Sequence, residues 1–73
     1  MKTDTALVMS FYEYEVPGTW QINLKWQGNH EISDFKLDRF GEVVSSAIET
    51  EHTGWVIVKP RRRLNVGDTI PLL

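Results

Sequence analysis

The two histidines of the chain each lie near an acidic residue. Glu31 follows His30 directly, and Glu49 precedes His52 by three residues in the segment ETEH. Imidazole and carboxylate groups in this arrangement could bind a metal ion or transfer a proton. The sequence contains no cysteine, no His-Glu-x-x-His motif and no third ligand at a diagnostic spacing. We therefore predict that the protein needs no metal or cofactor, and that both histidines have structural or solvent-exposed roles.

Serine could supply a nucleophile, and Ser45 and Ser46 are adjacent. They lie outside any Gly-x-Ser-x-Gly segment, the motif that exposes a nucleophilic serine on a sharp turn. The sequence also lacks a glycine-rich loop of the kind that holds phosphate groups. We therefore predict a protein that is not an enzyme.

A basic run, KPRRR at residues 59–63, is the one concentrated positive charge in the sequence. Its four cations are Lys59, Arg61, Arg62 and Arg63. Residues 1–58 carry four Lys/Arg against nine Asp/Glu, whereas residues 59–73 carry four against one. The run could contact nucleic-acid phosphates, but such footprints are usually larger and the negative remainder of the chain would repel a duplex. We favour a solvated sheet edge or a protein contact, because charges on an edge strand block pairing with other sheets.

Two segments with alternating apolar and polar residues, 6–16 and 19–27, come before these sites. Alternation with a period of two is typical of β-strands. Between the segments, Pro17 and Gly18 suit the two central positions of a tight turn. The sequence predicts a β-hairpin whose connection is a four-residue loop or has an adjacent bulge, because a two-residue type II turn would splay the strands.

The register of this hairpin decides which residues of the first strand face the core. Pairing of Glu15 with Trp20 gives one apolar face, which consists of Met9, Phe11, Ile22, Leu24 and Trp26. The opposite face then consists of Tyr12, Tyr14, Gln21, Asn23 and Lys25. A slip by one residue would turn Tyr12 and Tyr14 inward in place of two apolar side chains. The inward face of the second strand is the same in both registers, whereas that of the first strand stays open.

Residues 34–50 carry an apolar stripe with the spacing of an α-helix. Its members recur at steps of three and four residues and are Leu37, Phe40, Val44, Ala47 and Ile48. Ser33 can cap such a helix, and Asp34 suits its first turn. The outer face would carry a row of acidic residues, which are Asp34, Asp38, Glu42 and Glu49. This row is either a solvated face or a surface that binds and steers a basic partner.

The rest of the chain predicts at least one more strand. Residues 55–58 are all apolar, which is typical of a strand in the middle of a sheet, and Pro60 ends it. Whether residues 64–72 add an edge strand is left open. The expected fold is a single α+β domain over residues 1–73, in the order β-β-α-β with or without a final β-strand. One helix covers one face of a small antiparallel or mixed sheet, and the shared core includes Trp26, Phe40, Val44 and Ile57.

The composition of the chain reduces the number of possible functions and cellular locations. The sequence has no apolar stretch of the roughly 18 residues that a membrane span needs. The lack of cysteine favours the reducing cytoplasm, and the eight aromatic residues supply apolar surface for a homo-oligomer. We expect a small non-enzymatic regulator or adaptor, of the kind encoded by phages and mobile elements, that binds a protein through the acidic row and through Tyr12 and Tyr14. The alternative is an RNA or single-stranded DNA-binding protein that uses the basic run, with the tyrosines as stacking platforms.

Overall fold

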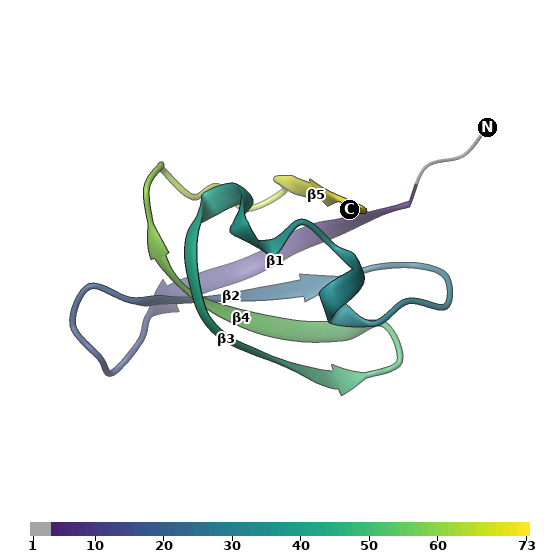
Figure 1. Ribbon diagram of the computed structural model, residues 1–73, viewed down its shortest axis with the longest axis horizontal. Coiled ribbons are helices and arrows are strands. Elements are labelled where there is room, and N and C mark those ends of the chain that lie inside the picture. Colours follow the sequence, from purple (N-terminus) through teal and green to yellow (C-terminus); the bar gives the residue numbers. More distant parts are fainter. Residues whose placement is uncertain (1–3) are drawn as a thin grey trace.

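The computed structural model describes residues 4–73 and shows a curled antiparallel sheet that forms half of a barrel (Figure 1). The strands are β1 (Thr5–Glu13), β2 (Trp20–Lys25), β3 (Gly41–Thr50), β4 (Thr53–Pro60) and β5 (Thr69–Pro71). Their order across the sheet is β3-β4-β2-β1-β5. Two short 3-10 turns, η1 (Ile32–Asp34) and η2 (Leu37–Phe40), lie on the connection from β2 to β3. That connection passes over β4, so β4 is inserted between two strands that precede it in the sequence.

The predicted hairpin is confirmed: β1 and β2 pair in antiparallel fashion. The Thr19 N–H donates to the Val16 carbonyl at 3.1 Å, and the Thr19 hydroxyl donates to the same oxygen at 2.6 Å. Gly18 has a φ of 83°, a value that Gly tolerates and that a type II turn requires at this position. The turn is part of a longer loop, residues 14–19, which relieves the splaying that a two-residue connection would impose.

The predicted register is wrong by two residues, because Trp20 pairs with Glu13 instead of Glu15. A β-bulge between Val8 and Ser10 then shifts the pairing again. An extra residue in a strand reverses which side chains face inward beyond it. Phe11 therefore faces the core side on one part of β1, whereas Val8 is buried on the other and Met9 is exposed. Neither register considered from the sequence is present, and the inward-facing set of β1 side chains changes at the bulge.

The predicted helix at residues 34–50 is absent, so the α+β fold class is wrong. Residues 41–50 form strand β3, and the described chain is 54% strand with no helix of seven or more residues. Only the first part of the apolar stripe is helical, and it forms a single 3-10 turn. Leu37 and Phe40, three residues apart, lie on the same side of the tighter η2 turn.

Local preference and pairing together explain why residues 41–50 are extended. Val43, Val44 and Ile48 are β-branched, which lowers their helix propensity and favours strands. Gly41 disfavours a helix interior by about 1 kcal/mol relative to Ala. The segment also pairs with β4 along most of its length, from Gly41 opposite Pro60 to Thr50 opposite Thr53. The sequence of residues 41–50 is compatible with both a helix and a strand, and pairing with β4 stabilises the strand.

Strand β4 occupies the predicted central position, since it pairs with β2 on one side and β3 on the other. Val56 and Val58 point into the main core. Ile57 is also buried, but alternation along the strand places it on the opposite face of the sheet. The expected core is therefore correct for Trp26 and Phe40, while Ile57 lies outside that cluster and Val44 is 53% exposed.

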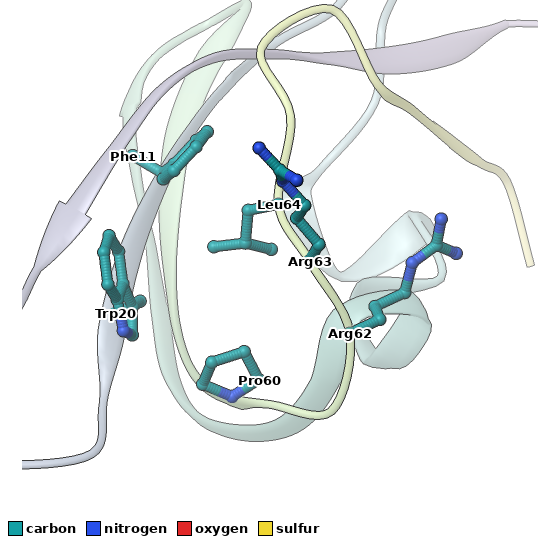
Figure 2. A pocket seen from close by; sticks show the side chains of 6 residues that line it. All are labelled: Phe11, Trp20, Pro60, Arg62, Arg63 and Leu64. Atoms are coloured by element: carbon teal, nitrogen blue, oxygen red, sulfur yellow. The ribbon is translucent and has the colours of Figure 1, made fainter.

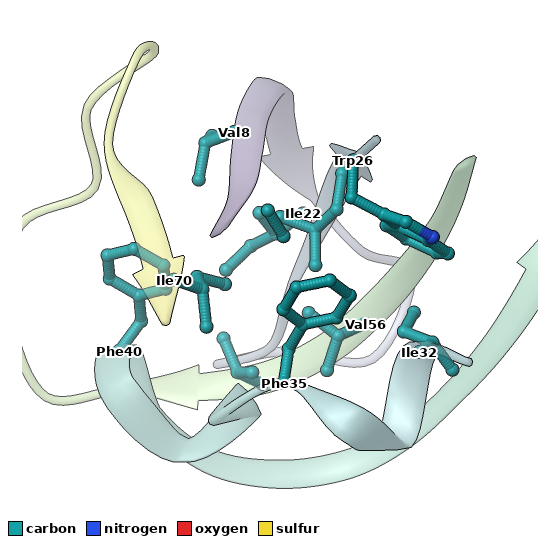
Figure 3. Packing of buried hydrophobic residues seen from close by; sticks show 11 residues of the cluster. Val8, Ile22, Trp26, Ile32, Phe35, Phe40, Val56 and Ile70 are labelled. Atoms are coloured by element: carbon teal, nitrogen blue, oxygen red, sulfur yellow. The ribbon is translucent and has the colours of Figure 1, made fainter. Parts of the chain in front are cut away.

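The core lies between the concave face of the sheet and the β2–β3 connection (Figure 3). The connection supplies Ile32, Phe35 and Phe40, which fill the open side of the half-barrel. The rings of Trp26 and Phe35 pack with their centroids 5.2 Å apart. The sheet residues of the cluster are Ala6, Val8, Ile22, Leu24, Val56, Val58 and Ile70. A connection with little regular structure thus does the covering that was expected of a helix.

The final segment does form an edge strand, β5, which pairs with β1. The outer side of β5 is covered by the β2–β3 connection. The Lys36 N–H donates to the Pro71 carbonyl at 2.9 Å, and Phe35 forms an isolated β-bridge with Leu72. In residues 4–73 there is no helix long and apolar enough to cross a membrane.

Candidate functional site: a groove with aromatic and arginine side chains

One end of the concave face is not covered by the β2–β3 connection and opens into a groove of about 380 Å³ (Figure 2). Six residues line it: Phe11, Trp20, Pro60, Arg62, Arg63 and Leu64. They come from β1, β2, the end of β4 and the segment that follows β4. The groove is therefore built by residues far apart in the sequence, which the sheet order brings together.

The aromatic wall depends on the β1–β2 pairing. Phe11 pairs with Ile22, and Trp20 is two residues from Ile22 on the same strand and thus on the same face. The Phe11 and Trp20 rings pack in a tilted arrangement with centroids 5.8 Å apart. Both side chains are half-buried, so each presents part of its ring to the groove.

The opposite wall belongs to the basic run. Its backbone is held by the Arg61 N–H, which donates to the Phe40 carbonyl at 2.8 Å. The Arg62 guanidinium lies over the Phe40 ring, with its central carbon 5.5 Å from the ring centroid, a cation–π arrangement. In Figure 2, Leu64 points between the two aromatic rings and the Arg63 guanidinium lies on the same side, whereas the Arg62 guanidinium points away from these rings. The groove therefore has an apolar floor and one guanidinium group, that of Arg63, at its edge.

The four cations of the basic run therefore have different surroundings. Lys59 lies at the end of β4, where its ammonium group is 3.5 Å from a Glu42 carboxylate oxygen. Arg61 is exposed and lies outside the groove lining. Arg62 and Arg63 both line the groove, but their guanidinium groups point to different sides, as alternation along an extended chain predicts (Figure 2). One of the four cations, Arg63, thus faces the groove with its charged group.

The expected acidic row does not form, because the helix that would align it is absent. Asp34 belongs to η1, where its carboxylate accepts a hydrogen bond from the Glu31 N–H at 2.9 Å. Asp38 belongs to η2 and is exposed. Glu42 and Glu49 lie near opposite ends of β3. These four carboxylates therefore occupy three separate elements and present no single face to a basic partner.

The tyrosines are also separated from the basic run. Tyr12 is exposed on β1 and pairs with Gln21, so it points to the face opposite Phe11. Tyr14 is half-buried at the start of the hairpin loop, and its N–H donates to the Thr19 carbonyl at 3.0 Å. Neither tyrosine lines the groove.

The histidines have different surroundings. His30 lies between two carboxylates, with Nε2 2.7 Å from Asp4 Oδ2 and Nδ1 3.9 Å from Asp34 Oδ2. The carboxylates contact opposite sides of the ring and cannot converge on one ion. His52 is exposed in the turn between β3 and β4, and its carbonyl accepts the Trp26 N–H at 2.9 Å. Within residues 4–73, no group of three His, Asp or Glu side chains is placed to hold a metal.

Sequence reasoning identified the arginines of the groove but missed its aromatic wall. Phe11 and Trp20 alternate with polar neighbours, which indicates a strand face but not where the covering of that face ends. Pro60 followed by three arginines was the available signal for the position of the groove, because a proline that ends a strand leaves the next residues at the end of the sheet. No family model matches this chain, and comparisons with curated proteins and with solved structures found no match either.

Proposed function

We propose that this protein is a non-enzymatic protein-binding module, and that its groove accepts an extended segment with an apolar side chain next to an acidic one. The observation that carries the proposal is the placement of Phe11, Trp20 and Leu64 beside the Arg63 guanidinium. In the proposed complex, the partner's apolar side chain packs against the Phe11 and Trp20 rings. Its carboxylate accepts hydrogen bonds from the Arg63 guanidinium.

The residue types favour a protein partner. Aromatic residues and arginine are enriched in protein interfaces and supply most of the binding energy at their centres. A groove of about 380 Å³ is at the small end of the range for ligand sites, which fits one or two side chains. A carboxylate suits the rim, because guanidinium groups bind it through two parallel hydrogen bonds.

The charges disfavour a nucleic acid as the main partner. The chain has a net charge of −2, and only two cations of the basic run line the groove. Lys59 has Glu42 as a neighbour, which weakens its attraction for phosphate. Nucleic-acid affinity at physiological salt depends on several concerted phosphate contacts. The absence of cysteine supports action in the cytoplasm, where thiols stay reduced and small domains do without disulfides.

Selection from a random peptide library displayed on phage tests the proposal. We expect enriched peptides to carry Asp or Glu beside an aromatic or aliphatic residue. Fluorescence polarisation with the selected peptides should show binding about tenfold or more weaker for Arg63→Gln, since a charge-assisted hydrogen bond contributes about 1.5–3 kcal/mol. Arg61→Gln removes the same charge outside the groove and should leave the affinity unchanged.

The same variants separate the alternative function from the proposed one. Labelled single-stranded RNA and DNA are titrated at about 150 mM salt, the physiological condition at which non-specific binding is weak. Micromolar or tighter oligonucleotide binding that is lost in Arg63→Gln, together with no enriched peptide motif, would replace the protein partner by a single-stranded nucleic acid.

A further inference from the structure

The two edge strands of the sheet, β5 and β3, differ in whether their outer sides are covered. The outer side of β5 and of Leu72 is covered by residues 34–36, as the Lys36 to Pro71 hydrogen bond and the Phe35–Leu72 bridge show. Strand β3 is the other edge, and no described strand pairs with its outer side. It is ten residues long and is exposed along nearly all of its length. A long open edge presents unpaired N–H and C=O groups that pair readily with another strand.

Strand β3 lacks the basic residues and the proline that often protect an edge. Its sequence, GEVVSSAIET, contains no lysine, arginine or proline. Three of its aliphatic side chains are exposed, Val43 at 37%, Val44 at 53% and Ile48 at 48%. Two bulges interrupt its pairing with β4, between Val43 and Ser45 and between Ile48 and Thr50. The stretch between the bulges, residues 45–48, remains regular and is free on its outer side.

We propose that β3 pairs in antiparallel fashion with β3 of a second copy of this chain, around a two-fold axis at Ser46. This register places Ser46 opposite itself and Ser45 opposite Ala47, all within the regular stretch. Val44, the residue at the first bulge, then lies opposite Ile48 of the other copy, so two aliphatic pairs flank the axis. Such cross-strand pairs are the main side-chain contribution to sheet stability. The two half-barrels become one continuous sheet.

The charges of β3 are compatible with this register and disfavour one of its neighbours. With the axis at Ser46, Glu49 lies opposite Val43 and Glu42 lies opposite Thr50. A shift by one residue would place Glu42 opposite Glu49 twice, and like charges directly opposite are destabilising. Within each copy, Lys59 is 3.5 Å from Glu42 and reduces its negative field. Closed two-fold dimers are also the commonest form of homo-oligomer.

Single-cysteine variants test the register, because the chain has no cysteine of its own. Residues directly opposite in antiparallel strands have Cα atoms about 4.5–5.5 Å apart, within the range that a disulfide spans. Under mild oxidation, Ser46→Cys should form a covalent dimer in high yield, and Ser45→Cys should not. Ser33→Cys, exposed in η1, measures random collision. Cross-linking of Ser46→Cys no better than that of Ser33→Cys, or preferred cross-linking of Ser45→Cys, would overturn the proposal.

Sedimentation equilibrium over a concentration series that reaches the millimolar range tests dimerisation itself. The unmodified chain should approach twice its mass of 8.5 kDa. The double variant Val44→Lys/Ile48→Lys should remain a monomer, because it places like charges opposite each other across the axis. Val16→Lys is a matched control in the hairpin loop, since Val16 is 53% exposed, as Val44 is. A mixture of the double lysine variant with Val44→Glu/Ile48→Glu should dimerise again. A chain that stays monomeric, or a dimer that the double lysine variant retains, would refute the pairing.

Discussion

Strands β3 and β4 are antiparallel neighbours with similar aliphatic content, yet their surroundings are opposite. Seven of the eight residues of β4 are buried or half-buried, including Val56, Ile57 and Val58, whereas eight of the ten residues of β3 are exposed. The difference comes from position in the sheet: β4 has a strand on each side, and β3 has one. Apolar composition alone therefore does not show whether a strand contributes to the core or is available for association.

The largest effect should come from the side chain that anchors the start of β3. Phe40 is fully buried in the main cluster and ends η2 directly before the strand. Phe40→Ala removes a ring from a close-packed site and should lower the free energy of unfolding by about 3–5 kcal/mol. Thermal unfolding followed by circular dichroism measures the change. A melting curve like that of the unmodified chain would mean that β3 does not depend on the core at all.

Valine in the central strand should be the next most sensitive. Val56→Ala removes two methyl groups from a side chain with no solvent exposure. The lost transfer free energy and the cavity together should lower stability by about 2–3 kcal/mol. Urea denaturation gives the value, and an unchanged slope would show that the compactness of the two states is retained. A loss below about 0.5 kcal/mol, the range typical of surface sites, would remove the contrast between the two strands.

The stability of the chain should also be sensitive to added volume at Gly41, which lies opposite Pro60 at the end of the β3–β4 pair. A Cβ atom at Gly41 would collide with the Lys59 carbonyl oxygen and lie 2.8 Å from the Pro60 Cα. Backbone atoms cannot move aside as the end of a long side chain can, so Gly41→Ala should lower stability by about 1–3 kcal/mol. Gly67→Ala is an informative comparison, because a Cβ there meets no atom within 4 Å and the strain comes from its φ of 94° alone. Calorimetry of both variants separates collision from backbone strain.

The smallest effect should be on the exposed edge. Val44→Ala makes the same change as Val56→Ala, but at a side chain that is 53% exposed. We expect the stability of the monomer to change by no more than about 0.5 kcal/mol. Urea denaturation at a concentration low enough to keep the chain monomeric is the required measurement. A loss equal to that of Val56→Ala would show that the β3 edge is covered within the monomer.

These two strands also mark the limit of what the sequence could predict. The continuous apolar run at residues 55–58 is typical of a central strand, because such a strand is buried on both faces. The segment at residues 41–50 has apolar spacing that suits a helix and β-branched residues that suit a strand. Pairing with β4 resolves this ambiguity, and pairing partners lie outside any local window. The acidic row depended on the helix and was lost with it.

The groove shows a second limit. Arg62 and Arg63 were identified as a charged run, since charge is visible in composition. Their aromatic partners, Phe11 and Trp20, were assigned to a strand without a role in binding. Recognising them needs the β1–β2 register and the extent of the covering connection. The bulge near Met9 also changes which side of β1 faces inward, and alternation alone does not reveal a residue inserted into one strand only.

The insertion of β4 between β2 and β3 has a consequence for the order in which the chain folds. The β1–β2 and β3–β4 pairs are local hairpins, whereas the β2–β4 seam joins residues as distant as Trp20 and Val58. Hairpins form within about 1–10 μs but are marginally stable alone. Bringing distant strands together has a larger entropic cost and sets slower rates. We therefore expect docking of the two hairpins along the β2–β4 seam to be the step that commits the chain to its native topology.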